Sequence, residues 1–296
     1  MTPLERGYAS ALAAVCIWAL VPVGTRFFVL RVDPYVFNVV RFAASGAAAF
    51  PLFAYAKPWR WPRSDQVLLL ACAVLSVPGY NIPVALGART VPGGELGVLI
   101  ATEPVMIAAL TLLLHHRPIH WRITGGSILA FAGVMLTSGV LSSTETLKWV
   151  STLQVLAGAF SWSCYTVLAV RLNQRHGTFG VTGAILVVGT VVLLALSLPA
   201  MHHVVWPDRA TTLMLAAMGL SSSLLGFLLW NFACAVVPAE RLGLFLYMLP
   251  AVSVYAGVQF LTESLTVQVL LGGALIVYGV WFASRPERAV PAAAIE

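Results

Sequence analysis

The sequence predicts an all-α integral membrane protein with ten transmembrane helices in two inverted five-helix repeats. Two observations are compositional: 59% of the 296 residues are hydrophobic and 9% are charged, and the mean hydropathy is +0.90. Soluble domains carry about 25% charged residues. The third observation is that apolar stretches of about 20 residues, enough to cross about 30 Å of hydrocarbon, follow one another along almost the whole chain. Strands of a membrane barrel would instead alternate polar and apolar residues.

The predicted spans are separated by short loops that contain proline and charged residues. Tryptophan and tyrosine are frequent at the span ends, which suits their preference for the headgroup layer. The chain leads directly into a full-length span with no cleavage motif after it, so we expect no cleaved signal peptide. The predicted spans are 8–28, 34–55, 65–86, 93–114, 121–140, 149–172, 178–200, 209–232, 239–261 and 266–284.

The protein is expected in a bacterial-type inner membrane, and the distribution of the 17 Lys and Arg residues predicts that both termini are cytoplasmic. Eleven lie on the side of the N-terminus and five on the opposite side, and cytoplasmic loops carry the excess of positive charge. The net charge of +6 therefore reflects topology, and we expect a lipid bilayer as partner and no nucleic acid. The five on the opposite side are Arg26, Arg31, Arg89, Lys148 and Arg209, and Arg41 lies within a span.

The two halves of the chain resemble each other at a shift of 146 residues. Trp18 also falls opposite Trp162 at a shift of 144, and the pair Gly125–Gly126 matches Gly272–Gly273 at a shift of 147. A run that keeps two prolines and a glycine in register is hard to obtain by chance. In that run Val91, Pro92, Leu96, Gly97 and Pro104 correspond to Val237, Pro238, Leu242, Gly243 and Pro250.

The repeat divides the spans into five and five, with units 1–145 and 146–296. Because five is odd, the second unit enters the membrane in the opposite orientation to the first. Inverted repeats are a recurring design of secondary transporters, whose substrate site lies near the membrane midplane where the halves meet. The alternatives are an old duplication retained only for packing, and a membrane scaffold or receptor that transports nothing.

These features resemble the drug/metabolite transporter superfamily, and within it the EamA-type members with ten helices in a 5+5 inverted repeat. The resemblance rests on the early Trp18, on the spacing from Gly97 to Pro104 and from Gly243 to Pro250, and on the double glycines of the fifth and tenth spans. It covers the whole chain. It implies movement of small metabolites by alternating access.

A finer resemblance concerns the substrate. The segment 158–165 and the Trp230–Asn231 pair look like segments of bacterial aromatic amino-acid exporters in this superfamily. That likeness implies export of Phe, Tyr or Trp together with other neutral amino acids. Arg41 departs from it, being more typical of general EamA members. A multidrug or organic-cation exporter is the alternative.

Two charged residues are predicted inside the membrane. Glu103 lies about ten residues, roughly 15 Å, into the fourth span, and intramembrane carboxylates usually face a cavity, a partner or a proton path. Its repeat equivalent is Leu249, so the fold does not require an acid here. Glu103 could bind a substrate ammonium, couple protons, or be neutral and hydrogen-bonded between helices. Arg41 could extend to the surface, pair with Glu103, or contact a substrate carboxylate.

Aromatic and polar residues deep in the spans are the predicted lining of a substrate cavity. Buried Trp and Tyr need hydrogen-bond partners, and their faces stack on other rings. The alternative is that many are anchors at the lipid interface, which is at least as good for Trp230 near its span end. With Glu103, the predicted substrate-binding residues are Trp18, Tyr80, Asn81, Ser161, Trp162, Tyr165, Asn231 and Tyr247.

Prolines within spans remove backbone hydrogen bonds and permit kinks. In a transporter they are candidate hinges, and a static kink is the alternative. The helix is expected to break around Tyr80 and Asn81, since a broken helix at depth usually lines a cavity. The candidate hinges are Pro22, Pro78, Pro83, Pro104 and Pro250.

Other chemistry has little support in the sequence. The four cysteines lie inside predicted spans or, for Cys234, two residues beyond one; they have no Cys-x-x-Cys spacing and are expected to act as small buried hydrophobes. His115, His116 and His120 are expected in an interfacial loop rather than at a metal. No nucleotide-binding or hydrolase motif occurs. We therefore expect no enzyme activity, no cofactor and no metal, while the sequence leaves monomer or homodimer open.

Overall fold

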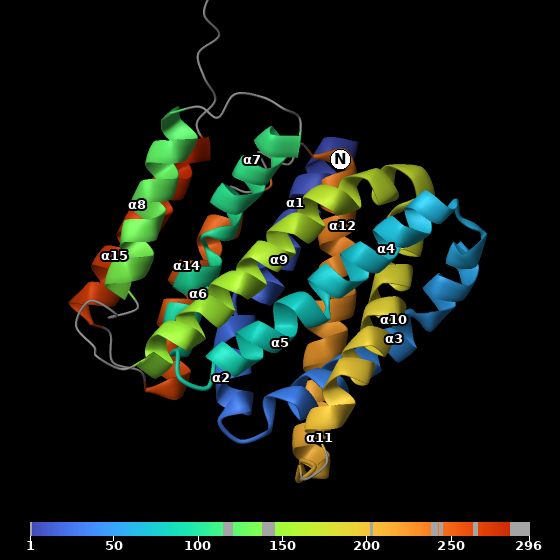
Figure 1. Ribbon diagram of the computed structural model, residues 1–296, viewed down its shortest axis with the longest axis horizontal. Coiled ribbons are helices and arrows are strands. Elements are labelled where there is room, and N and C mark those ends of the chain that lie inside the picture. The colour runs from blue at the N-terminus through green and yellow to red at the C-terminus, as the bar shows by residue number, and fades with distance from the viewer. Residues whose placement is uncertain are drawn as a thin grey trace, which may run out of the picture.

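The computed structural model describes residues 2–114, 121–137, 146–201, 204–237, 242, 245–262 and 266–284. Over these residues the chain forms helices and no strand (Figure 1). Seven helical segments among these residues, some made of two consecutive helices, are long and apolar enough to cross a membrane. The all-α membrane fold expected from composition is confirmed.

The described helices follow the ten predicted spans in order. Several spans consist of two consecutive helices. The helices of the first half are α1 Pro3–Trp18, α2 Val21–Val29, α3 Pro34–Ala56, η1 Pro58–Arg60, α4 Arg63–Ser76, α5 Pro78–Gly87, α6 Gly93–Ile100, α7 Glu103–Leu114 and α8 Trp121–Thr137. Those of the second half are α9 Thr146–His176, α10 Thr178–Ser197, η2 Leu198–Ala200, α11 Arg209–Met218, η3 Gly219–Leu225, α12 Gly226–Val236, η4 Phe245–Tyr247, α14 Met248–Leu261 and α15 Val267–Ser284.

Side-chain caps fix the start of several helices at the membrane surface. Thr2 and Glu5 form a reciprocal capping box at α1, with bonds of 2.8 and 3.2 Å. Asp33 accepts from the amide of Tyr35 at the start of α3, and Asp208 does the same for Thr211 at α11. Such caps satisfy amides that have no partner within the helix. The bonds from Thr211 also hold the pKa of Asp208 below its ordinary value.

Several spans are interrupted in their middle. The first breaks after Trp18, where Ala19 and Leu20 separate α1 from α2. The third breaks at Val77 and the fourth at 101–102. In the eighth span, the π-helical segment η3 separates α11 from α12. Interrupted helices leave backbone groups free, and inside a membrane this is tolerated where protein or a cavity surrounds them.

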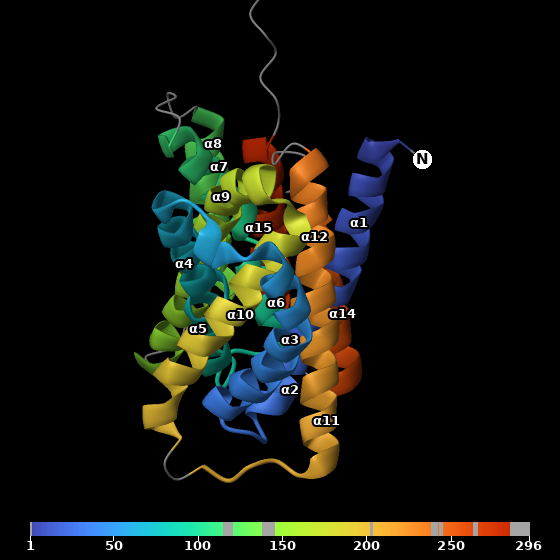
Figure 2. The same cartoon turned by 90° about the vertical axis from the view of Figure 1, so that its right-hand side faces the viewer.

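The main helix contacts join the first half of the chain to the second. Helix α8 packs on α15, α3 on α10, α5 on α9, α1 on α12, and α6 on α14. Figure 1 shows the α8–α15 pair at one end of the molecule, and Figure 2 shows α1 beside α12. The halves are therefore interleaved, and the space between them lies in the middle of the molecule.

The helices run back and forth between two faces. The N-terminal end of α1 lies at the upper face in Figure 2, whereas the links from α2 to α3 and from α10 to α11 lie at the lower face. The outer surface between these faces is apolar, with large side chains such as Phe131 and Phe260 exposed by 62% and 72%. A surface of this kind suits contact with lipid and not with water.

Candidate functional site

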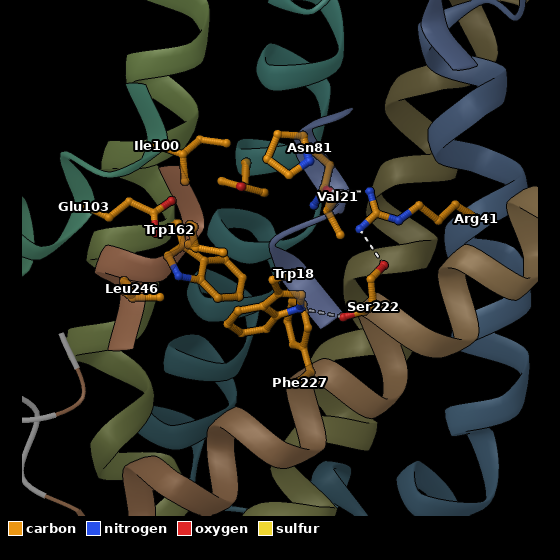
Figure 3. A pocket seen from close by; sticks show the side chains of 13 residues that line it. Trp18, Val21, Arg41, Asn81, Ile100, Glu103, Trp162, Ser222, Phe227 and Leu246 are labelled. Atoms are coloured by element: carbon orange, nitrogen blue, oxygen red, sulfur yellow. Dashed lines mark hydrogen bonds between the residues drawn. The ribbon is translucent and has the colours of Figure 1, made fainter. Parts of the chain in front are cut away.

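A pocket lies where the interrupted spans meet. It combines four aromatic side chains, one cation, one acid, two small polar side chains and several aliphatic ones, drawn from both halves of the chain (Figure 3). Each break described above contributes to the lining. The lining residues are Trp18, Val21, Pro22, Arg41, Tyr80, Asn81, Ile100, Glu103, Trp162, Ser222, Phe227, Leu246 and Leu249.

The cavity is narrow in this conformation, with a volume of about 50 Å³. One water molecule needs about 10–15 Å³ on this kind of measure, and a cavity that holds benzene is about 150 Å³. A few waters therefore fit, and a ring-bearing molecule requires the walls to move apart. A second, smaller lobe shares Arg41, Tyr80 and Asn81 with the pocket and extends to Thr25 and Phe37 on α2 and α3.

Arg41 forms the cationic wall, and its side chain is turned inward. The residue is 5% exposed, which excludes the expectation that its side chain extends to the surface. Nη1 donates to Asn81 Oδ1 at 3.2 Å, and Nη2 donates to Ser222 Oγ at 3.1 Å. Nε has no hydrogen-bond partner among the described residues, and no described carboxylate, Glu103 included, lies within ion-pair distance of the guanidinium.

The break in the third span orients Asn81 toward Arg41. Its Nδ2 donates to the carbonyls of Ser76 and Val77, next to the break, at 3.1 and 2.9 Å. The Val77 carbonyl also accepts from the backbone amide of Asn81 at 3.1 Å. The backbone carbonyl of Asn81 accepts from Asn38 Nδ2 at 3.1 Å. The amide oxygen of Asn81 is therefore fixed in a position to accept from the guanidinium.

Glu103 forms the acidic wall, at the start of α7. It is 3% exposed, and its Oε1 has no hydrogen-bond partner among the described residues. Figure 3 shows it across the pocket from Arg41, with Trp18 and Trp162 between them. Leu249, its repeat equivalent, also lines the pocket. Since a buried polar atom without a partner is unfavourable by roughly 1–3 kcal/mol, Oε1 is a candidate contact for a ligand.

Trp162 is the centre of the aromatic wall. It lies on α9 and its ring centroid is 5.4 Å from that of Trp18, 5.3 Å from Tyr80 and 5.1 Å from Phe227. Two of these contacts are edge-to-face and one is tilted, the arrangements that aromatic quadrupoles favour. The faces left open to the cavity can stack on an aromatic ligand or on a cation.

Three of the predicted lining residues lie behind the pocket. Ser161 Oγ donates to the carbonyl of Leu75 at 2.9 Å, which ties α9 to α4. Tyr165 OH donates to Asn231 Oδ1 at 3.2 Å, and Asn231 Nδ2 donates to Thr182 Oγ1 at 2.9 Å. The polar groups of Tyr165, Asn231 and Thr182 thus bond to one another between α9, α12 and α10. They support the aromatic wall from behind and are not part of the cavity surface.

Of the remaining predicted positions, Trp230 is buried, and the others lie outside the residues that the structure describes. Trp230 is 2% exposed and its ring centroid is 5.3 Å from that of Trp18, so the expectation of a lipid-interface anchor is wrong. Tyr247 belongs to η4, and its side chain lies outside the described residues. His115, His116 and His120 also lie outside the described residues.

The predicted hinge prolines fall mostly at helix starts. Pro22 and Pro78 stand in the first turn after a break, where a missing amide has no cost, and Pro104 is the second residue of α7. Pro83 lies inside α5, and Pro250 lies in α14. Pro22, Pro78 and Pro104 are thus placed at the breaks beside the pocket, whereas Pro83 lies within a helix and the side chain of Pro250 is outside the described residues.

Several lining residues were missed by the sequence reasoning. Ser222 and Phe227 come from η3 and α12, and Leu246 and Leu249 come from η4 and α14. Aliphatic lining residues look like any other residue of an apolar span. Among the cysteines, Cys16 is exposed and Cys72 is buried, so the expectation of burial is wrong for Cys16.

The chain matches the family model described as "EamA-like transporter family" twice, over residues 5–139 and 149–285. It is 30% identical over 230 residues to a probable terminal-alkyne amino-acid exporter of Streptantibioticus cattleyicolor, which covers 76% of each chain. It is 27% identical over 227 residues to the threonine/homoserine exporter RhtA of Escherichia coli K12, covering 76% of this chain and 74% of that one.

A solved crystal structure has the same fold, with a TM-score of 0.67 at 19% sequence identity over 94% of this chain and 96% of the other. The two family matches together span nearly the whole sequence and include every lining residue of the pocket. The chain is a multi-pass membrane protein that belongs to the EamA-like transporter family of the drug/metabolite transporter superfamily.

Proposed function

We propose that this protein exports neutral amino acids with apolar, above all aromatic, side chains. The observation that carries the proposal is the pocket with Arg41 on one wall, Glu103 on the other and aromatic rings between them (Figure 3). A zwitterion presents one negative and one positive group. Arg41 binds the carboxylate, Glu103 binds the ammonium, and Trp162 packs on the side chain.

The names of the relatives support the substrate class. Both relatives described above are named amino-acid exporters, one for terminal-alkyne amino acids and the other for threonine and homoserine. A carboxylate and an ammonium are the groups that these substrates share. Their side chains differ, so the aromatic preference proposed here rests on the rings that line this pocket.

Transport proceeds by alternating access between two inverted repeats, residues 1–145 and 146–296. The contact pattern supports this, because a two-fold exchange of the halves maps the contact of spans 1 and 8 onto that of spans 6 and 3. The breaks agree as well: at the shift of 146, Val77 corresponds to Ser223 in η3, and 101–102 corresponds to the boundary between η4 and α14. A pocket too narrow for a ring-bearing substrate must open to one side at a time.

Orientation and energy source complete the proposal. The excess of Lys and Arg on the N-terminal side supports a cytoplasmic location for both termini in the inner membrane. Glu103 binds a proton when no ammonium faces it, because an unpaired carboxylate is costly at that depth. A proton therefore returns inward as the amino acid leaves.

Export of organic cations is the second candidate. It is favoured by the Oε1 of Glu103, which lacks a described partner and lies beside an aromatic wall. Aromatic rings with an acid recognise cations well. If the protein exports organic cations, Arg41 binds no ligand and only joins α3, α5 and η3.

Flux into proteoliposomes distinguishes the candidates. Purified protein would be reconstituted and given radiolabelled phenylalanine, threonine or tetraphenylphosphonium, with protein-free liposomes as control. The proposal predicts saturable uptake of phenylalanine and weaker uptake of threonine. Uptake of the organic cation alone would replace the proposal with the second candidate, and no flux of any of the three would favour a scaffold or receptor.

A further inference from the structure

Ser222 joins the two halves of the protein at the pocket. It lies in the π-helical segment η3, Gly219–Leu225, and accepts from Arg41 Nη2 through its hydroxyl at 3.1 Å (Figure 3). Its backbone carbonyl accepts from Trp18 Nε1 at 2.9 Å. Arg41 and Trp18 belong to the first half of the chain, and η3 belongs to the second. Short π-helical segments inside α-helices are frequently found at functional sites.

The π geometry makes the Ser222 carbonyl available. The amide of Gly226 bonds to the carbonyl of Ser221, five residues back, whereas in an α-helix it would bond to that of Ser222, four residues back. Close approach is allowed by two glycines. A Cβ at Gly219 would overlap the carbonyl oxygen of Arg41, and one at Gly226 would overlap the indole nitrogen of Trp18.

The bonds of the guanidinium leave one edge incomplete. A carboxylate binds a guanidinium most strongly through two parallel bonds, and one such pair of donors is Nε–H with the neighbouring Nη2–H. On Arg41, Nε has no partner among the described residues, and Nη2 is bonded to Ser222. Nη2 carries two N–H groups, and Figure 3 shows its bond to Ser222 on the side of the guanidinium that carries Nε. A carboxylate that takes this edge therefore displaces the serine hydroxyl.

The serine hydroxyl can leave without losing its own donor bond. Ser222 Oγ donates to the carbonyl of Met218 at 2.6 Å, within the same helix. This bond does not involve Arg41, so it persists when the guanidinium turns to another acceptor. Asn81 continues to accept from Nη1 and holds the guanidinium in place during the exchange.

We propose that the substrate carboxylate and Ser222 compete for Arg41, so that substrate binding breaks the side-chain bond between α3 and η3. This inference rests on the proposed function, since it requires a substrate that carries a carboxylate. In the empty pocket the Arg41–Ser222 bond ties α3 to η3. When the carboxylate takes Nε and Nη2, that tie is broken, and the bond from Trp18 Nε1 to the Ser222 carbonyl is left to hold η3 against the first half.

A fixed positioning role for Ser222 leads to the opposite expectation. If the hydroxyl only held the guanidinium in place, removing it would misorient Arg41 and weaken binding. If it competes, removing it strengthens binding, since the carboxylate no longer displaces a partner. The empty protein would also lack the Arg41–Ser222 bond, so it would change conformation more readily without substrate.

The test is transport of radiolabelled phenylalanine by Ser222→Ala in proteoliposomes, compared with Ser221→Ala. Ser221 is exposed and its hydroxyl bonds only to the carbonyls of Ala217 and Met218, so the control removes the same group from the same segment. For Ser222→Ala we expect the KM for phenylalanine to fall about fivefold, the equivalent of one hydrogen bond, and kcat to fall with it. Ser221→Ala should match the wild type.

Phenethylamine, which has the same ring and ammonium but no carboxylate, serves as the second probe. Its affinity, measured by competition with phenylalanine, should be the same for Ser222→Ala as for the wild type. A KM for phenylalanine that rises or stays unchanged in Ser222→Ala would overturn the competition. An equal gain for phenethylamine would overturn it as well, because the carboxylate would then not be involved.

Ser222→Cys covers the case in which Ser222→Ala does not insert. The thiol is a weaker acceptor than the hydroxyl, so its KM should lie between those of wild type and Ser222→Ala, and a wild-type KM would count against the proposal. Binding in detergent can be followed by intrinsic tryptophan fluorescence, to which Trp18 and Trp162 at the pocket contribute. Failure of the proposed function is a separate outcome. If the wild-type protein transports no amino acid, both the proposed function and the competition for Arg41 are wrong. If the wild type transports phenylalanine but the variants have an unchanged KM, only the competition is wrong.

Discussion

Two buried side chains of opposite charge, Arg41 and Glu103, lie on separate walls of the pocket without bonding to each other. Taking charges out of water is unfavourable by several kcal/mol each unless they gain partners. Arg41 recovers part of this through Asn81 and Ser222, which are neutral. An arrangement that leaves both charges incompletely paired is explained best by a ligand that completes them.

Glu103→Gln tests the proton-coupling role. The substitution keeps the shape and removes the titratable group. If one proton is exchanged for each substrate, a gradient of one pH unit drives about tenfold accumulation, and the variant should lose this response. Glu5→Gln is the matched control, because Gln also serves in a capping box and Glu5 lies at the exposed start of α1. A pH response in Glu103→Gln equal to that of the wild type would remove Glu103 from coupling.

Trp162→Ala tests the aromatic wall. We expect the apparent affinity for phenylalanine to fall about tenfold, the equivalent of roughly 1.4 kcal/mol of lost ring contact. Because truncating a buried Trp can also destabilise the protein by about 3–5 kcal/mol, Trp162→Phe is included to retain packing and should give an intermediate loss. Trp206→Ala, at a site that is 57% exposed, is the control. An unchanged affinity would leave Trp162 as a packing residue.

Single-residue patterns identified part of the pocket and not all of it. Trp18, Tyr80 and Trp162 could be selected because aromatic residues at depth need partners, and Glu103 because a charge in a span is rare. Tyr165 and Asn231 satisfy the same criteria, yet their polar groups bond to each other. Whether a buried polar group faces a cavity or a protein partner depends on contacts across the fold, which residue type does not reveal.

At the scale of helices, the pocket is built from breaks. The break at Val77 could be expected from Pro78, Gly79 and Pro83 around it. The π-helical segment η3 could not, because its sequence of small and aliphatic residues suits a continuous helix. One extra residue in that turn changes which of three consecutive serines faces the pocket. Contacts with Arg41 and Trp18, from another part of the chain, determine that Ser222 is the serine that faces the pocket.

Helices α4 and α9 are joined at one end by an ion-pair cluster. Asp65, whose side chain is 2% exposed, accepts from Arg175 Nη1 at 2.9 Å and lies 2.8 Å from His176 Nε2. The His176 ring stacks on Trp61 with centroids 3.9 Å apart and planes at 8°. The cluster connects a helix of the first half to one of the second, at the end where α4 starts and α9 ends.

Asp65→Asn tests the contribution of this cluster to stability. Arg175 is 48% exposed, which weakens its pairing through solvent screening, so we expect only a modest fall in the free energy of unfolding. Thermal unfolding in detergent should show a midpoint lower by a few degrees. Asp208→Asn is the control, since Asn caps a helix as well as Asp does. Equal midpoints for the two variants would show that the cluster adds no stability.

At the scale of the whole molecule, the interleaving of the halves explains why the site lies in the middle. Each of the main helix pairs joins one half to the other, so any relative movement of the halves changes the width of the pocket. The ten-span architecture could be predicted from hydropathy, because the bilayer thickness sets span length. The pairing of spans could not, since it depends on complementary helix faces that the apolar composition hides.

On the proposed function, the pocket recognises both charges of an amino acid. The most direct measurement is displacement of radiolabelled phenylalanine from the purified protein by two analogues, phenethylamine without the carboxylate and 3-phenylpropionate without the ammonium. We expect each analogue to displace phenylalanine at least about tenfold less well than unlabelled phenylalanine does, since each lost ion contact is worth about 1.4 kcal/mol or more. Displacement by either analogue as effective as by phenylalanine itself would contradict it.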